Sequence, residues 1–299
     1  MVSFDRTFMR IDELFESGRP LVSFEFFPPK DEAGEAQLLK AIDDLRPLAP
    51  DFVSVTKTGG GTPQTLDLTA RIQSELDVRC MAHMTCAGHT AEEMGAYLDR
   101  LWDSGVRNVL ALRGDPPAGE RFNAVEGGFG YATDLVKFAR ERQDFCVAVA
   151  GYPESHPQSL NLTRDVEYLK LKQDNGAHFV ITQLFFDNAD FFRWRDLAEK
   201  LGVSIPLCAG IMPISSVSQI KRFVMMCGAK IPHWLLVRLE SLESDPLAVA
   251  AAGVDHAITQ CEELLREGVP GLHFYTLNRS KATNLIGQSL RGSGALPAS

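Results

Sequence analysis

Residues 146–186 read CVAVAGYPESHPQSLNLTRDVEYLKLKQDNGAHFVITQLFF and contain one complete unit of the fold. The apolar windows at the two ends, 146–152 and 179–186, have the length and the β-favouring composition of strands. Between them Leu162, Val166 and Leu169 recur at helical spacing. A strand, a helix and a second strand in this order predict two parallel strands joined by a crossover helix.

The same alternation runs along the whole chain. Further strand-like windows lie at 21–27, 52–58, 79–86, 108–114, 206–212 and 271–277. Eight strand–helix units predict an α/β protein with the (β/α)8 TIM-barrel fold, in a single catalytic domain spanning 1–299. A doubly wound sheet is the competing layout, but it usually carries a Gly-rich phosphate turn after its first strand, where this chain has FFPPK.

Two segments fall outside the regular repeat. Residues 1–20 carry several acids and lack a long apolar core, so we expect a short amphipathic helix there and neither a signal peptide nor a membrane span. Residues 231–268 read as extra helices, which we interpret as an insertion within the last unit.

Charge and cysteine content limit the partners. A net charge of −9 argues against general nucleic-acid binding but not against small anionic ligands. Six scattered cysteines without a CxxC motif indicate reduced thiols and a cytoplasmic enzyme. No apolar run is long enough to cross a bilayer, so we expect no membrane partner. The HMTC motif at 83–86 lacks the further ligands of a zinc site, so we expect no metal.

Polar residues stand at the strand ends, where catalytic groups of such barrels lie. Alternation along FEFFPPK (24–30) puts Phe24 and Phe26 on one strand face and Glu25 on the other, toward the barrel mouth. Each residue also has a structural interpretation: Glu25 could pair with an arginine, and His83 could be a satisfied core histidine. The joint placement of these polar residues at the strand ends favours a functional site more than any single residue does. The other strand-end candidates are Thr56, Arg113, Gly114, Asp115, Tyr152, His156, Gln183 and Arg279.

One helix adds a possible ligand contact. Asp165, Tyr168 and Lys172 follow one another at i, i+3 and i+7, beside the core stripe of residues 162–172. A long polar ligand lying over this helix would meet an acceptor, a ring and a cation. A solvated helix face is the alternative.

Taken together, the motifs resemble methylenetetrahydrofolate reductase of the bacterial, flavin-dependent type. The resemblance covers nearly the whole chain, in the order of the family, and looks like a catalytic barrel without the regulatory domain of eukaryotic relatives. The matching segments are SFEFFPPK (23–30), VSVT (53–56), HMTC (83–86), LRGDPP (112–117), YPESHP (152–157), ITQLFFD (181–187), GIMP (210–213) and HFYTLNR (273–279).

This resemblance implies FAD at the barrel mouth and a ping-pong reaction. NADH or NADPH would reduce the flavin at N5 and leave, and 5,10-methylenetetrahydrofolate would then be reduced to 5-methyltetrahydrofolate. By the same resemblance Glu25 is the general acid and Asp115 lies beside flavin and pterin. The positions implied to contact FAD are Thr56, His83, Arg113, Gly114, Asp115, Ala132, Tyr152, His156, Asp165 and Lys172, and those implied to bind substrate are Gln183, Gln219, Phe223 and Arg279. Relatives are oligomeric, so a homo-oligomer is expected by analogy.

Three positions depart from the family pattern. Lys57 stands where relatives have a tyrosine near the flavin, and Tyr168 and Leu171 replace an asparagine and an arginine facing FAD. We therefore expect the diphosphate contact to depend more on Lys172 and FAD to be held less tightly. Two alternatives remain open: a flavin-independent pterin-dependent methyltransferase barrel, and a folate- or flavin-binding relative without catalysis.

Overall fold

A computed structural model describes residues 9–57, 62–115 and 122–297, and these form a closed barrel of eight parallel strands. Each strand pairs with the next in the sequence, and β8 pairs with β1 to close the ring. The TIM-barrel prediction is therefore confirmed. The strands are β1 (Leu21–Phe26), β2 (Phe52–Val55), β3 (Cys80–Thr85), β4 (Asn108–Leu112), β5 (Cys146–Gly151), β6 (Phe179–Thr182), β7 (Leu207–Ile211) and β8 (Gly271–Tyr275).

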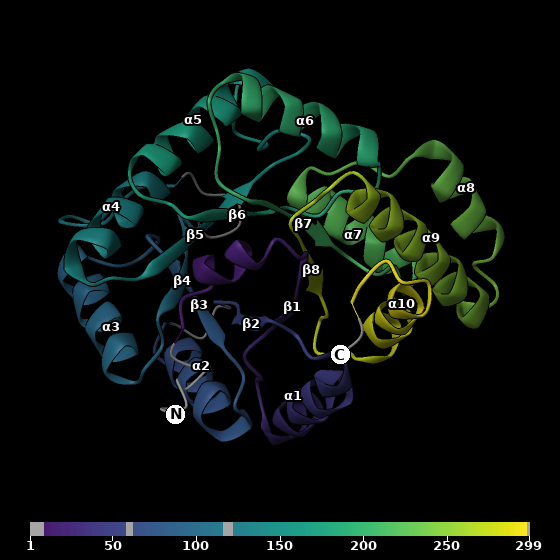
Figure 1. Cartoon of the computed structure of the whole chain (residues 1–299), viewed down its shortest axis with the longest axis horizontal. Coiled ribbons are helices and arrows are strands. Elements are labelled where there is room, and N and C mark those ends of the chain that lie inside the picture. The colour runs from purple at the N-terminus through teal and green to yellow at the C-terminus, as the bar shows by residue number, and fades with distance from the viewer. Residues whose placement is uncertain (1–8, 58–61, 116–121, 298–299) are drawn as a thin grey trace.

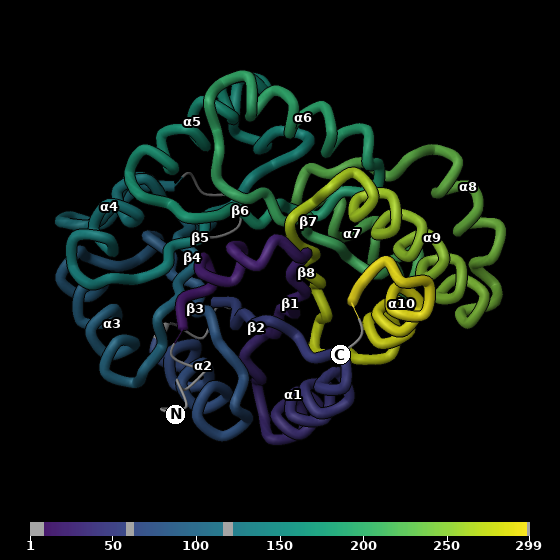
Figure 2. Tube along the Cα trace, viewed as in Figure 1, coloured from purple at the N-terminus to yellow at the C-terminus, as the bar shows by residue number. Residues whose placement is uncertain are grey.

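Helices surround the barrel (Figure 1). They are α1 (Glu32–Leu45), α2 (Thr62–Leu76), α3 (Ala91–Asp103), α4 (Ala132–Arg142), α5 (Leu162–Asp174), α6 (Asn188–Lys200), α7 (Val217–Cys227), α8 (His233–Ser241), α9 (Pro246–Arg266) and α10 (Lys281–Gly292), with short 3-10 helices η2 (Asp12–Ser17) and η3 (Arg46–Leu48). Helices α8 and α9 are the extra helices expected before the last strand. The tube in Figure 2 shows α10 beside α1, so the last helix of the barrel packs next to the first.

Polar side chains set where several helices begin. The side chain of Asn161 accepts a hydrogen bond from the backbone N–H of Arg164 and caps α5, and Asp245 caps α9 in the same way ahead of Pro246. These groups satisfy backbone donors that have no partner inside the helix. The cap at Asn161 fixes the start of the helix that carries Asp165 and Lys172.

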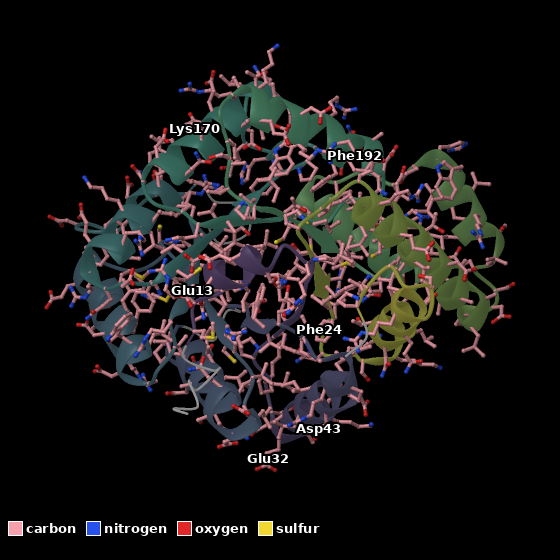
Figure 3. The ribbon with its side chains drawn as sticks, in the orientation of Figure 1. Glu13, Phe24, Glu32, Asp43, Lys170 and Phe192 are labelled. Atoms are coloured by element: carbon pink, nitrogen blue, oxygen red, sulfur yellow. The ribbon has the colours of Figure 1, made fainter. Side chains whose placement is uncertain are left out.

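Alternation along each strand divides the side chains between two layers. Phe24 and Phe26 are buried in the outer layer, between the strands and the helices, whereas Glu25 lies on the inner face. Figure 3 shows Phe24 inside the ring of helices, while Glu32, Asp43 and Lys170 lie on its outer side. Burial of the outer apolar layer provides most of the driving force for folding.

The 3-10 helix η2 closes the N-terminal end of the barrel. It lies over the centre of the strand ring in Figure 1, as its purple colour shows. Ile11 is fully buried, and the ring of Phe15 lies 5.4 Å from that of Phe179 at the start of β6. The expected N-terminal helix of residues 1–20 is thus described as this short 3-10 helix, and residues 1–8 lie outside the described part.

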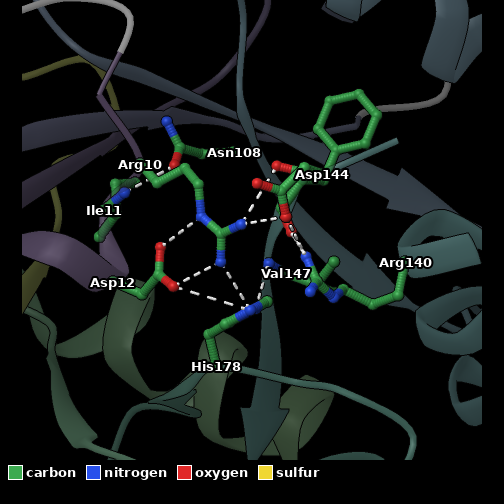
Figure 4. Close-up of polar contacts among 9 residues, drawn as sticks. Arg10, Ile11, Asp12, Asn108, Arg140, Asp144, Val147 and His178 are labelled. Atoms are coloured by element: carbon green, nitrogen blue, oxygen red, sulfur yellow. Dashed lines mark hydrogen bonds and ion pairs between the residues drawn. The ribbon is translucent and has the colours of Figure 1, made fainter. Parts of the chain in front are cut away.

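A polar network fixes η2 to the strands (Figure 4). The guanidinium of Arg10 donates to Asp12, at 2.6 Å from Nη2 to Oδ2, and pairs with Asp144. The imidazole of His178 contacts both Arg10 and Asp12, while its Nδ1 accepts from the N–H of Val147 at 3.0 Å. The network joins the N-terminal segment to the loops before β5 and β6.

Asp12, Cys146 and His178 lie close enough together to raise the question of a metal site. Metal-bound histidines donate their second ring N–H to an acceptor, whereas Nδ1 of His178 here accepts from a backbone N–H. Arg10 also places a cation against both Asp12 and His178. The cluster is therefore built as an ion-pair network.

One strand boundary differs from the sequence pattern. Strand β6 ends at Thr182, earlier than the apolar window 179–186 suggested, because the window continues into residues that pack under the helices. In the described residues no helix is long and apolar enough to cross a membrane.

Candidate active site

A cavity of about 280 Å³ lies at the C-terminal ends of the barrel strands. It brings together residues that lie on the eight strands or directly after their ends, and residues from α7. Ten of the predicted site residues line it: Glu25, Thr56, His83, Arg113, Gly114, Asp115, Tyr152, His156, Gln183 and Phe223. The placement of functional candidates at strand ends thus matches the position where barrel enzymes carry their chemistry.

Glu25 lies at the inner end of this cavity and is almost fully buried. Its Oε2 atom lies 3.4 Å from Nε2 of His83 on β3 and 3.4 Å from Nε2 of His273 on β8. No arginine or lysine pairs with it in the described residues, so the structural interpretation of Glu25 as the partner of an arginine does not hold. Burial lowers the pKa of His83 to about 4, which keeps that ring neutral near pH 7.

Two buried polar atoms on the cavity wall have unused hydrogen-bonding capacity. Thr56 Oγ1 and His83 Nε2 have no hydrogen-bond partner among the described residues, since the contact between His83 and Glu25 is poorly aligned. Buried polar groups are nearly always satisfied in native proteins. Unsatisfied atoms that face a cavity indicate that a polar ligand completes them.

Arg113 and Gly114 shape the side of the cavity that follows β4. Gly114 has φ +81°, and a Cβ there would lie 2.9 Å from Cβ of Ala87 and 3.0 Å from Cβ of Thr85. Only glycine fits this left-handed, crowded position. The guanidinium of Arg113 lies over the ring of Phe122, at 4.9 Å, and has no carboxylate within ion-pair distance in the described residues.

Lys172 adds a second cation near the same wall. Its Nζ donates to the carbonyl of Ala150 at 2.9 Å. Burial lowers the pKa of this amine to about 8, with Asp165 acting in the opposite direction and Arg113 in the same one. A cation held in a partly buried place without a salt bridge is poised for an anionic ligand.

Asp165 connects helix α5 to the loop after β5. Its Oδ2 accepts from the backbone N–H of His156 at 3.3 Å, and burial raises the pKa of its carboxyl. The rings of His156 and Tyr152 meet edge to face at 4.7 Å. Burial, aided by the cations Arg113 and Lys172, lowers the pKa of His156, so the neutral ring predominates near pH 7.

The opposite wall carries Gln183 and Phe223. The Oε1 atom of Gln183 accepts from the N–H of Leu184 at 2.9 Å, which leaves its amide N–H groups for a ligand. Gln219 and Arg279 do not line this cavity. They line a neighbouring cleft of about 380 Å³ that also contains Arg222 and the serines at the start of α7.

The remaining predicted positions lie away from the cavity. Ala132 is buried at the first residue of α4. Asp165 and Lys172 do not line the cavity either, although Lys172 contacts Ala150 on its wall. Tyr168 is exposed beneath the guanidinium of Arg164, at 4.8 Å. Leu171 is also exposed, and Lys57 turns toward the loop after β3, donating to Thr85 Oγ1 at 2.7 Å.

The structure adds residues that the sequence reasoning did not select. Tyr275 lines the cavity and donates to the carbonyl of Thr182 at 2.5 Å, and Cys227 lies on the wall near Phe223. His273 is fully buried next to Glu25. Alternation along β8 was the available signal, because it places His273 and Tyr275 on the inner face together.

With this geometry established, comparison with known proteins gives a family. Residues 10–291 match the family described as methylenetetrahydrofolate reductase. The chain belongs to the methylenetetrahydrofolate reductase family. Nearly every strand and helix described above lies within the matched span.

Individual reductases of this family support the same assignment. The 5,10-methylenetetrahydrofolate reductase of Escherichia coli is 36% identical over 275 residues, covering 91% of this chain and 91% of that protein. Methylenetetrahydrofolate reductase (NADH) 1 of Arabidopsis thaliana is 38% identical over 287 residues, covering 91% of this chain but 48% of that protein. The chain therefore spans about half the length of the plant reductase.

A solved structure shows the same fold at low sequence identity. It is an uncharacterised protein from Clostridium thermocellum that binds two copies of 5-methyl-5,6,7,8-tetrahydrofolic acid. The two share a TM-score of 0.64 and 13% identity over 95% of this chain and 99% of the other. At that identity the match concerns the fold alone.

Proposed function

We propose that this chain reduces 5,10-methylenetetrahydrofolate to 5-methyltetrahydrofolate with electrons from NADH or NADPH, using FAD as its cofactor. The single observation that carries the proposal is Glu25, a buried carboxyl at the inner end of the cavity with no cationic side chain paired to it in the described part of the chain. A buried acid that faces a ligand cavity suits proton donation. Membership of the family supports the reaction.

The residues present fit a flavin dinucleotide. Thr56 Oγ1 and His83 Nε2 offer unsatisfied polar atoms deep in the cavity, suited to the polar edge of a ring system. Arg113 and Lys172 would hold the diphosphate, and Asp165 would accept from a ribose hydroxyl. FAD, when bound, would supply the hydride acceptor and donor that lets two substrates use one site in turn.

Glu25 would act on the folate. The acid would give a proton to the folate and promote opening of its five-membered ring to the N5 iminium cation, which accepts the hydride. Asp115, at the cavity rim, would lie near the pterin. Gln183 would bind the pterin through its free amide N–H groups, and Phe223 would stack on the aromatic ring that follows it.

Gln219 and Arg279 would bind the carboxylate tail of the folate. Their cleft lies beside the cavity. Helix α7 connects the two, because it carries Gln219 in the cleft and Phe223, about one turn later, in the cavity. No carboxylate lies within ion-pair distance of Arg279 in the described residues. We propose NADH as the preferred nucleotide, because the relative from Arabidopsis thaliana carries NADH in its name.

The visible spectrum of the purified protein with added FAD tests this function. We expect a bound flavin band that bleaches with NADH and returns when methylenetetrahydrofolate is added without oxygen. Failure of both NADH and NADPH to bleach bound flavin would refute the reductase proposal. Folate-dependent methyl transfer without any flavin would instead favour the transferase, and FAD binding without either half-reaction would favour a non-catalytic protein.

A further inference from the structure

We propose that His273 is a positioning residue for Glu25: its Nε2–H, fixed by Ser23, donates to Glu25 Oε2 and stabilises the carboxylate that remains after proton transfer to the substrate. This inference rests on the proposed role of Glu25 as proton donor. It concerns a side chain that does not line the cavity and therefore lies behind the acid, away from the ligand.

The two ring nitrogens of His273 connect Ser23 to Glu25. Nδ1 of the ring lies 2.7 Å from Oγ of Ser23, two residues before Glu25 on β1. Nε2 lies 3.4 Å from Glu25 Oε2 and 3.4 Å from Oγ of Ser54 on β2. Catalytic hydrogen bonds are often long in the absence of ligand and shorten in the complex.

Packing holds the ring in this orientation. His273 is fully buried, and its ring stacks on Phe52 with centroids 6.0 Å apart and planes 20° apart. Tyr275 meets it edge to face at 5.5 Å. The ring has little freedom to flip, because Phe52 and Tyr275 pack against it and polar groups contact both of its nitrogens.

Ser23 determines which nitrogen carries the proton. A neutral imidazole has one N–H and one acceptor nitrogen. When the Ser23 hydroxyl donates to Nδ1, the ring proton sits on Nε2 and points at Glu25 Oε2. In the other tautomer Nδ1–H would donate to Ser23 Oγ, and the Ser23 hydroxyl would have to donate to the carbonyl of Leu272. That carbonyl oxygen lies 3.4 Å from Oγ, so this hydrogen bond would be weaker.

The chemistry follows from this arrangement. In the proposed step Glu25 gives a proton to a nitrogen of the folate, so the substrate gains one proton and Glu25 becomes a carboxylate. His273 neither gains nor loses a proton. Its N–H on Oε2 favours the ionised product of the step, and a hydrogen bond to a charged group is stronger than one between neutral groups.

The other titratable groups around Glu25 are His83 from β3 and Tyr275 from β8. Burial lowers the pKa of His83 to about 4 and raises that of Tyr275, so both stay neutral near pH 7. Neither therefore supplies a charge that would replace the His273 contact. His83 also faces the cavity, where a ligand competes for it.

Two amide substitutions separate the two ring nitrogens. His273→Gln places an amide near the position of Nε2, and His273→Asn places one near Nδ1, within reach of Ser23 but not of Glu25. We expect reoxidation of the reduced flavin by methylenetetrahydrofolate to fall about 10- to 100-fold in His273→Asn, the size expected for loss of a hydrogen bond to a charged group. His273→Gln should retain most of the rate.

Reduction of the flavin by NADH needs no proton from Glu25 and serves as the internal control. In His273→Asn the rate loss should appear in the folate half-reaction with little change in folate KM, and its pH profile should move toward higher pH. Equal rates for wild type and His273→Asn would overturn the proposal. Equal losses in both variants would also overturn it, because a merely structural role does not distinguish the two amides.

NMR of the protein without cofactor tests the tautomer of His273 independently of enzyme activity. In the wild type, ¹⁵N NMR of histidine side chains should show His273 as the Nε2–H tautomer, and Ser23→Ala should weaken that preference. An Nδ1–H tautomer in the wild type would overturn the proposal. If the wild type shows no flavin reduction, the proposed function fails, whereas this NMR result still decides the hydrogen bond between His273 and Glu25.

Discussion

Replacing Lys172 by methionine is expected to stabilise the protein without cofactor and to weaken its binding of FAD. The amine is partly buried, donates to the carbonyl of Ala150 and has no salt bridge in the described residues. Burial lowers its pKa from 10.5 to about 8. Methionine has a similar length and removes the charge, so the variant isolates the electrostatic cost of keeping this cation beside the cavity, against Ala150.

The magnitude follows from the pKa. A fall from 10.5 to about 8 corresponds to about 3 kcal/mol of disfavoured charge at pH 7. Residual solvent contact and loss of the hydrogen bond to Ala150 reduce the gain, so we expect the free energy of unfolding to rise by about 1–2 kcal/mol. Stabilisation at the expense of a ligand site is a common trade-off in proteins.

The sign of the pH dependence is specific. Between pH 8 and 10.5 the folded wild type has lost the Lys172 proton while the unfolded chain retains it, so wild-type stability rises with pH in this window. The advantage of Lys172→Met should therefore shrink by up to about 1.4 kcal/mol per pH unit above pH 8. In the wild type, FAD affinity should also fall above pH 8, because the free protein must take up a proton to present the cation.

Urea unfolding of the cofactor-free protein at pH 7 and pH 9.5, together with FAD titration by fluorescence, measures both effects. Lys170→Met is the matched control, since Lys170 lies on the same helix but pairs with Asp174 at the surface. It should change stability by less than about 0.5 kcal/mol and leave FAD binding unaltered. A loss of stability at pH 7 in Lys172→Met, or unchanged FAD affinity, would show that the cation has no such role.

Three further substitutions test separate parts of the structure. Glu25→Gln should still be reduced by NADH but should fail to return electrons to methylenetetrahydrofolate in stopped-flow absorbance, and a normal folate rate would exclude the acid role. Gly114→Ala should lower stability by about 1–3 kcal/mol in thermal unfolding, because it places a Cβ against Ala87 at positive φ; an unchanged melting temperature would contradict this. Arg10→Leu should lower the free energy of unfolding by about 2–3 kcal/mol at pH 7. Burial opposes ionisation of Asp12, but the hydrogen bond to Arg10 and the charges of Arg10 and His178 together outweigh it and lower the pKa. The loss should therefore be full above about pH 4 and shrink as the pH falls further, and a pH-independent difference would contradict the ion-pair account.

The fold was accessible from sequence because its signal is local and repeated. Each strand window carries β-favouring residues, and the helices between them show a clear apolar stripe. Alternation around Glu25 correctly separated Phe24 and Phe26 from the acid, since the pleat of a strand fixes the direction of successive side chains. Strand ends were less predictable, as Thr182 shows: hydrophobicity continues past it while the hydrogen-bonded ladder stops.

Long-range contacts account for what the sequence did not reveal. Arg10 and Asp144 are 134 residues apart, and nothing near either residue indicates that they meet under the barrel. Helical spacing placed Tyr168 beside Asp165, but a stripe on a helix does not specify how far it rotates from the cavity. Tyr168 consequently ended at the surface beneath Arg164.

Local electrostatics explain how a chain with a net charge of −9 can hold anionic ligands. Many of its cations are committed to surface ion pairs, such as Lys170 with Asp174, which contribute little to stability. Arg113 at the cavity, Lys172 beside it and Arg279 at the neighbouring cleft instead lack ion-paired carboxylate partners within the described part of the chain. In the proposed function these cations would hold a diphosphate and a carboxylate tail, while the buried Glu25 forms no ion pair with a lysine or arginine of the described residues. The local distribution of cations, and not the net charge, would therefore decide which small anions the proposed site attracts.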